Sequence, residues 1–212
     1  MAKIKAVLFD MDGVLIEAKD WHFEALNKAL ELFGMKISRY DHLVTYDGLP
    51  TKKKLQMLSV ECGLPVSLHS FINEMKQIYT LEIVHALCKP RFHHEYALSK
   101  LKEDGYHLTV CSNSIVKTIK VMMEKSSLIN HLDFCLSAED VPAPKPEPFI
   151  YQAAMKKLGL KAEECMIIED NENGIKAAKA SGAWVMEVDE VDEVNYQNIK
   201  NHIAKFEGAS HD

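Results

Sequence analysis

The chain has 212 residues, of which 47% are hydrophobic and 26% are charged, a balance typical of globular proteins and too apolar for a disordered chain. Lysine and arginine together number 25 and aspartate and glutamate 31, so the formal net charge is −6. Because nucleic-acid binding requires dense positive charge, this balance argues against a DNA- or RNA-binding protein. It is compatible with a small phosphorylated ligand, since one local basic pocket is enough to hold such a ligand.

The cysteines are odd in number and form no Cys-x-x-Cys pair, which favours buried, reduced thiols in a reducing compartment. They are Cys62, Cys88, Cys111, Cys135 and Cys165. No apolar run approaches the roughly 18 residues of a membrane span, and the acidic residues at positions 10 and 12 come too early for a signal peptide. We therefore expect a cytoplasmic monomer that binds neither membranes nor nucleic acids.

The predicted elements begin with a buried strand over residues 4–9, an apolar run that stops abruptly at Asp10-Met11-Asp12-Gly13. Residues 17–88 contain no strand candidate, and their apolar residues recur at helical spacing. Thr51 is expected to cap a helix within this stretch through its side chain. The helices predicted here, the first two ended by a glycine, cover about 20–33, 51–62 and 68–87.

After Pro90, candidate helices and strands alternate along the chain. The predicted strands are 107–111, 133–136, 165–168 and 184–188. The predicted helices are 93–104, 115–125, 147–158, 172–181 and 195–205. This alternation predicts a parallel sheet with right-handed crossovers and helices on both faces. The fold class is therefore α/β, with a sheet domain of residues 1–16 and 89–212 and an all-helical insert at 17–88. Ligands of open α/β sheets bind beyond the carboxyl ends of the strands, so the insert is expected to act as a lid.

Polar side chains follow four of the predicted strands. They are Asp10 and Asp12, Ser112 and Asn113, Lys145 within Pro142-Ala-Pro-Lys-Pro-Glu-Pro148, and Glu169 with Asp170. Four carboxylates that converge at one edge of a sheet cost stability unless a cation balances them. The clustering therefore points to a functional site rather than to a requirement of folding.

Each feature has an ordinary structural explanation when it is taken alone. Asp12-Gly13 is a common turn, and Ser112-Asn113 is expected to cap the following helix while its amides offer an anion site. Glu169-Asp170 is compatible with a solvated turn, and a single lysine such as Lys145 is usually solvated. A calcium loop of the EF-hand type is excluded, because the positions after Gly13 lack the acid and the glycine that it needs. The combination, with prolines as a rigid mount around the lysine, favours function.

The chemistry that fits these residues is phosphoryl transfer. Two carboxylates, a backbone carbonyl, waters and one phosphate oxygen suit octahedral Mg²⁺. Such an ion and Lys145 together would balance the negative charges, so that an anionic nucleophile can approach phosphorus. One aspartate can form an acyl phosphate, and a carboxylate two residues away can protonate the leaving oxygen and later deprotonate water.

The same residues resemble the four motifs of the haloacid dehalogenase superfamily of phosphotransferases. In chain order the motifs are Phe9-Asp-Met-Asp-Gly-Val-Leu15, Val110-Cys-Ser-Asn113, Lys145-Pro-Glu-Pro148 and Ile168-Glu-Asp-Asn-Glu-Asn-Gly174. The match spans nearly the whole chain, and the helical insert looks like the cap of the β-phosphoglucomutase-like subfamily. The resemblance implies a Rossmann-like catalytic core, residues 1–16 and 89–212, with a helical cap domain at 17–88.

By this resemblance Asp10 is the nucleophile and a Mg²⁺ ligand, and Asp12 is the general acid/base and a ligand through its backbone carbonyl. Asp170 ligates the metal, and Glu169 ligates it or supports its ligands. The residues implied to bind the phosphoryl group are Ser112, Asn113 through its amide, and Lys145. The dehalogenases of the superfamily lack the second aspartate, so Asp12 argues against dehalogenation.

Three residues of the insert are candidate contacts for the substrate. His22 matches a histidine that the subfamily often carries on its first cap helix, although a surface histidine is the plain alternative. Gly48-Leu-Pro-Thr-Lys52 resembles the substrate-facing loop, which suggests Thr51 and Lys52, although lysines 52–54 also fit a solvated helical turn. The chain departs from the subfamily at Glu17-Ala18, where Asp-Ser or Asp-Thr is frequent, and mutases tend to have arginine in place of Thr51.

These features predict a Mg²⁺-dependent phosphatase that hydrolyses a small phosphorylated metabolite, such as a sugar or polyol phosphate, through an aspartyl-phosphate intermediate. A sugar-phosphate mutase of the β-phosphoglucomutase type is the close alternative, but residues 17–88 offer a second phosphate only one arginine, Arg39. A receiver-like phospho-switch also places acids, a hydroxyl and a lysine at strand ends around Mg²⁺. Such switches are single domains without a helical insert, which weighs against that alternative.

Overall fold

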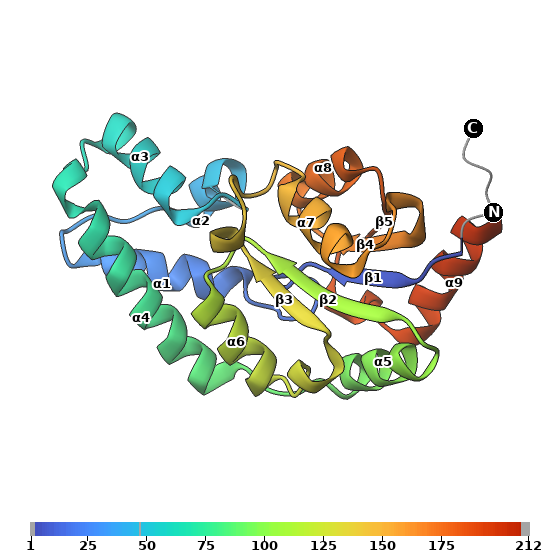
Figure 1. The fold of residues 1–212 in the computed structure, drawn as a ribbon. Coiled ribbons are helices and arrows are strands. Elements are labelled where there is room, and N and C mark those ends of the chain that lie inside the picture. The colour runs from blue at the N-terminus through green and yellow to red at the C-terminus, as the bar shows by residue number, and fades with distance from the viewer. Residues whose placement is uncertain (1–2, 47, 209–212) are drawn as a thin grey trace. The chain divides into compact units, whose positions relative to one another are not determined.

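The computed structural model describes residues 3–46 and 48–208, and the chain divides into two compact units (Figure 1). One unit combines the stretch that ends at Glu17 with the stretch that begins at Lys89, and the other is Ala18–Cys88. The chain passes from one unit to the other twice, between Glu17 and Ala18 and between Cys88 and Lys89.

A five-stranded parallel sheet in the order β3-β2-β1-β4-β5 forms the centre of the first unit. The strands are β1 (Ala6–Phe9), β2 (His107–Ser112), β3 (Phe134–Ser137), β4 (Cys165–Glu169) and β5 (Trp184–Glu187). The middle strand is β1, in which Phe9 pairs with Val110 of β2 on one side and with Ile168 of β4 on the other. Since all strands are parallel, their carboxyl ends meet at one edge, and the predicted α/β class is confirmed.

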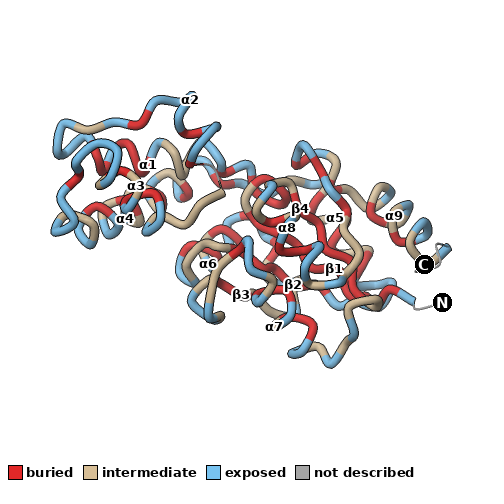
Figure 2. The backbone as a smooth tube through the Cα atoms, turned by 90° about the horizontal axis from the view of Figure 1, so that it is seen from above, coloured by how far each residue is buried: buried red, intermediate tan, exposed pale blue. Residues whose placement is uncertain are grey.

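Helices cover both faces of this sheet (Figure 1): α7 and α8 pack on one face, and α5, α6 and α9 on the other. Their bounds are α5 (Phe92–Glu103), α6 (Val116–Lys125), α7 (Phe149–Leu158), α8 (Glu172–Ser181) and α9 (Tyr196–Gly208). Short 3₁₀ segments lie at Ile129–His131, Ala138–Asp140, Ala162–Glu164 and Val191–Glu193. Every residue of β1 and β4 is buried (Figure 2), as expected for apolar strands covered on two faces.

The second unit is helical throughout its described residues. It contains α1 (Lys19–Glu31), α2 (Arg39–Asp41), a π-helical turn (His42–Tyr46), α3 (Thr51–Cys62), a 3₁₀ turn (Val66–Leu68) and α4 (His69–Leu87). Helices α1 and α4 pack along each other. The unit has a hydrophobic cluster of its own, made of Leu26, Ala29, Leu30, Ile37, Tyr46, Leu55, Leu58, Leu64 and Ile72.

Two predicted helix caps are wrong. Thr51 is the first residue inside α3, whose cap position is Pro50, and no side chain caps this helix. Ser112-Asn113 does not cap α6, because the Val116 amide donates to Glu139 Oε2 at 2.8 Å. A carboxylate from a later segment therefore satisfies the first turn of α6, and the polar groups after β2 are left for other contacts.

None of the helices in the described ranges combines the length and the apolar composition that crossing a bilayer requires.

Candidate active site

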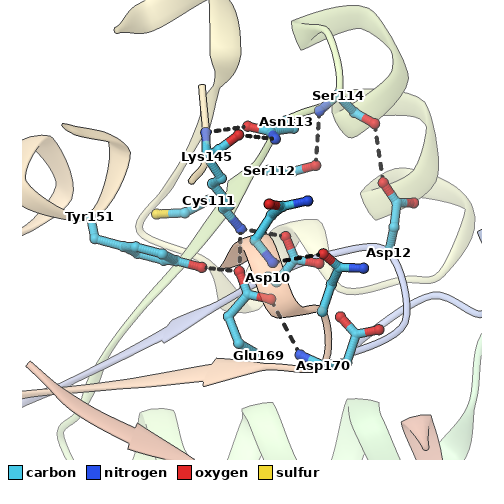
Figure 3. A network of polar contacts seen from close by, with 12 residues as sticks. Asp10, Asp12, Cys111, Ser112, Asn113, Ser114, Lys145, Tyr151, Glu169 and Asp170 are labelled. Atoms are coloured by element: carbon cyan, nitrogen blue, oxygen red, sulfur yellow. Dashed lines mark hydrogen bonds and ion pairs between the residues drawn. The ribbon is translucent and has the colours of Figure 1, made fainter. Parts of the chain in front are cut away.

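The first acid of the site lies directly after the central strand (Figure 3). The Asp10 amide donates to the Ile168 carbonyl of β4 at 3.0 Å, so the β1–β4 pairing continues one residue beyond the strand. The chain then turns back sharply, and the Gly13 amide donates to the Ile16 carbonyl at 2.7 Å. Gly13 has φ 96°, a conformation that glycine adopts without strain. This turn keeps Asp12 close to the edge of the sheet.

A group of three carboxylates forms at this edge. Ligand oxygens of Asp10, Glu169 and Asp170 all lie within 4.8 Å of one another. Asp10 and Glu169 are buried and Asp170 is half-buried. Burial raises the pKa of Asp10 well above its usual range, and the Lys145 ammonium opposes this effect. Because clustered carboxylate oxygens are the ligands of hard divalent cations, the group fits a metal site.

Lys145 supplies the positive charge that the structure places inside this group. Its Nζ donates to Asp10 Oδ1 and to Glu169 Oε1, each at 2.6 Å, and the residue is only 3% exposed. Burial acts to lower the pKa of Lys145, but the carboxylates of Asp10 and Glu169 outweigh it and raise this pKa above its usual range. These two carboxylates thus favour the charged form of the lysine, whose ammonium lies between them.

Ser112 is the last residue of β2 and Asn113 follows it, and both make contacts that the sequence did not predict (Figure 3). The Asn113 side chain holds the backbone of Lys145, since Nδ2 donates to the Lys145 carbonyl at 3.2 Å and Oδ1 accepts from its amide at 2.9 Å. Ser112 Oγ accepts from the Ser114 amide at 3.0 Å, and Ser114 Oγ donates to Asp12 Oδ2 at 3.1 Å. The loop after β2 is thus hydrogen-bonded both to the backbone of Lys145 and to the side chain of Asp12.

The sequence analysis missed two residues that contact Glu169. The Tyr151 hydroxyl of α7 donates to Glu169 Oε1, and a Cβ added at Gly174 of α8 would lie 2.0 Å from the same oxygen. In the sequence Tyr151 has the spacing of a core residue on an amphipathic helix, so its hydroxyl gave no separate signal. Gly174 stands within the fourth motif, but only the packed structure shows what it faces.

The three candidate residues of the helical unit lie on two helices. His22 of α1 is half-buried, and its Nδ1 lies 3.2 Å from Nζ of Lys76, a residue of α4 that the sequence analysis did not consider. Thr51 is half-buried at the start of α3, and Lys52 is exposed. The single arginine of this unit, Arg39, forms an exposed ion pair with Asp20 at 2.8 Å.

A parallel sheet with converging acids, a hydroxyl and a buried lysine at its carboxyl edge defines an α/β enzyme with a helical insert. Residues 7–188 match the model of the haloacid dehalogenase-like hydrolase family. The chain belongs to this family, and the resemblance drawn from its four motifs is confirmed.

Curated relatives cover most of the chain at low identity. The chain is 26% identical over 182 residues to a phosphorylated carbohydrates phosphatase of Thermotoga maritima, across 84% of this chain and 82% of that protein. It is 28% identical over 198 residues to a probable pseudouridine-5′-phosphatase of Saccharomyces cerevisiae, across 87% and 82%. Among solved structures, β-phosphoglucomutase from Clostridium difficile superposes with a TM-score of 0.84 at 19% identity, covering 97% of this chain and 100% of that one. This last similarity concerns the fold alone.

Proposed function

We propose that this hydrolase is a Mg²⁺-dependent phosphatase of a small phosphorylated metabolite, with Asp10 as the nucleophile. The observation that carries the proposal is the convergence of the Asp10, Glu169 and Asp170 carboxylates, two of which, Asp10 and Glu169, pair with the buried Lys145 ammonium. Relatives named as phosphatases of phosphorylated carbohydrates, pseudouridine 5′-phosphate and phosphoglycolate support the substrate class.

The residues divide the reaction into two steps. Asp10 attacks phosphorus, the bond to the ester oxygen breaks, and Asp12 gives that oxygen a proton. Asp12 then takes a proton from water, the water oxygen attacks phosphorus, and inorganic phosphate leaves while the Asp10 carboxylate is regenerated. Throughout, Lys145 and the Ser112 hydroxyl bind the phosphoryl oxygens and balance their charge.

The metal would be held by Asp10, Asp170, the Asp12 carbonyl and Glu169, which binds it directly or orients its ligands. When bound, Mg²⁺ supplies positive charge that screens the phosphate from the anionic nucleophile. EDTA is therefore expected to stop turnover and Mg²⁺ to restore it, whereas Ca²⁺ is expected to inhibit because its looser coordination misplaces the nucleophile. Full activity in EDTA would contradict the metal assignment.

The decisive experiment is release of p-nitrophenol from p-nitrophenyl phosphate by Asp10→Asn and a matched control. Asp104→Asn is a suitable control, because Asp104 pairs with Lys200 and accepts from the Tyr196 hydroxyl, and it lies just before β2 begins, at the amino-end edge of the sheet. Asp10→Asn is expected to fall below about a hundredth of wild-type activity with unchanged circular dichroism, and the control to keep its activity. An Asp10→Asn variant more active than this would refute the assignment of Asp10 as the nucleophile. A panel of phosphorylated metabolites then identifies the substrate.

Hydrolysis is favoured over a mutase reaction because residues 17–88 contain a single arginine, Arg39, with which to hold a second phosphate. The test is ³¹P NMR with β-glucose 1-phosphate and a bisphosphate activator, in which free phosphate supports the phosphatase and clean conversion to glucose 6-phosphate the mutase. His22, Thr51 and Lys52 are proposed to influence substrate choice. Lys52→Ala should then raise KM for the natural substrate and leave KM for p-nitrophenyl phosphate unchanged.

A further inference from the structure

We propose that Tyr151 is a positioning residue of this active site, which fixes the Glu169 carboxylate and through it the Lys145 ammonium and the metal ligands. The inference rests on the proposed function, and it concerns a side chain that none of the four sequence motifs contains.

The first argument is the position of the Tyr151 hydroxyl, the only polar group of this side chain. The side chain is completely buried on the sheet-facing side of α7, within the hydrophobic cluster formed with β1, β2 and β4. Its hydroxyl donates to Glu169 Oε1, and Glu169 is itself only 1% exposed (Figure 3). Phenylalanine would fill this apolar cluster equally well, and burying a hydroxyl costs free energy unless it is bonded. Packing therefore does not account for the tyrosine, but a bond to a buried carboxylate does.

The second argument is how Glu169 is held. Oε1 accepts from both the Tyr151 hydroxyl and Lys145 Nζ, whereas Oε2 accepts from the Asp170 amide at 3.2 Å. On the side of α8, the carboxylate fills the space that a side chain at position 174 would need. Two donors on one oxygen fix the rotation of the carboxylate, so that the other oxygen keeps its place beside Asp170. The Tyr151 ring adds to this, since Lys145 Nζ lies 4.8 Å from its centroid.

The third argument concerns the division of charge. The Lys145 ammonium is shared between Asp10 and Glu169, at 2.6 Å from each. The hydrogen bond from the Tyr151 hydroxyl offsets part of the negative charge on Glu169 Oε1. It therefore weakens the attraction between Glu169 and the ammonium, relative to that between Asp10 and the ammonium. Without the hydroxyl, Lys145 would bind Glu169 more tightly and a phosphoryl group at Asp10 less well. Residues that orient metal ligands in this way typically change metal affinity or activity about 10- to 100-fold when they are removed.

The experiment compares Tyr151→Phe with Tyr106→Phe, a control that removes another buried tyrosine hydroxyl of the same unit, bonded to Lys200 at 3.0 Å. Isothermal titration calorimetry measures the Kd of Mg²⁺ without any turnover, and p-nitrophenyl phosphate gives kcat and KM. For Tyr151→Phe we expect the Kd of Mg²⁺ to rise about 10-fold and kcat to fall about 10-fold or more, with little change in KM. Tyr106→Phe should match the wild type in all three quantities.

A double-mutant cycle shows whether Tyr151 acts through Glu169. In a Glu169→Ala background, Tyr151→Phe should change neither the Kd of Mg²⁺ nor kcat any further. If Tyr151→Phe leaves Kd and kcat as in an active wild type, or costs as much in the Glu169→Ala background, the inference is wrong and the proposed function stands. If the wild type neither binds Mg²⁺ nor hydrolyses phosphate esters, the proposed function fails and this inference fails with it.

Discussion

Gly174→Ala is the substitution whose effect follows most directly from the packing around the site. The added Cβ would lie 2.0 Å from Glu169 Oε1, 2.1 Å from Cδ and 2.2 Å from Oε2, so the whole carboxylate would have to move. That carboxylate is held by Lys145 and Tyr151 and cannot move without losing one of these bonds. Overpacking of this kind costs about 1–3 kcal/mol, whereas alanine gains up to about 1 kcal/mol over glycine in a helix.

The net loss is therefore about 1 kcal/mol, which lowers Tm by about 2–4 °C in a chain of this size. Differential scanning fluorimetry measures the shift, and the p-nitrophenyl phosphate assay should show a large fall in kcat because the carboxylate is displaced. Gly208→Ala is the control, since a Cβ there meets no atom of the described residues within 4 Å beyond its own helix turn, and its Tm should not fall.

The result that would refute this reasoning comes from a second background. All three atoms nearest the added Cβ belong to Glu169, so Glu169→Ala removes the clash. In that background Gly174→Ala should raise Tm slightly through helix propensity, which reverses the sign of its effect. The reasoning is wrong if Gly174→Ala is as stable as the wild type, or if it lowers Tm equally in both backgrounds. Either result would mean that Glu169 is not the reason why position 174 requires glycine.

Three further outcomes are expected. Asn113→Ala removes both side-chain bonds to the Lys145 backbone, so kcat should fall about 10-fold and unfolding should become easier by about 1–3 kcal/mol, measured by activity and urea titration. Burial lowers the pKa of His94 to about 4, so the unfolded chain takes up this proton first, and stability should fall from about pH 6.5 to pH 4 by up to about 3 kcal/mol. His94→Gln should flatten that pH dependence in urea titrations at pH 7 and pH 4.5. Glu139→Ala should lower Tm by about 2–4 °C because α6 loses its capping acceptor, whereas Glu139→Gln, which keeps an acceptor, should not.

The elements that the sequence predicted well are those whose signal is local. The apolar run before Asp10 and the glycine that ends α3 locate strand and helix boundaries without knowledge of the fold. The strand-end positions of Asp10 and Glu169 follow from the same reasoning, because parallel strands share one carboxyl edge.

What the sequence could not provide depends on contacts between segments far apart in the chain. Glu139 accepts the hydrogen bond that caps α6, and Glu169 of β4 accepts the one from the Tyr151 hydroxyl. In both cases the partner is too distant in sequence for a local pattern to predict it. The pairing of His22 with Lys76 likewise joins two helices, and an isolated lysine within an amphipathic pattern is read as solvated. Helix periodicity tells which side chains face inward, but the atoms they meet are decided by tertiary packing.

The central place of β1 has a consequence for how this chain acquires its structure. Its Ala6 pairs with His107 on one side and with Cys165 on the other, so β1 has no partner strand until the chain has been made as far as β2, about 100 residues later, and has its second partner only after β4. The buried residues of the hydrophobic cluster in the helical unit, by contrast, all lie between Leu26 and Ile72. Local contacts form faster than distant ones, and domains form in order during synthesis. The helical unit is therefore expected to fold first, while β1, which precedes Asp10, stays an exposed apolar segment without a partner strand during synthesis.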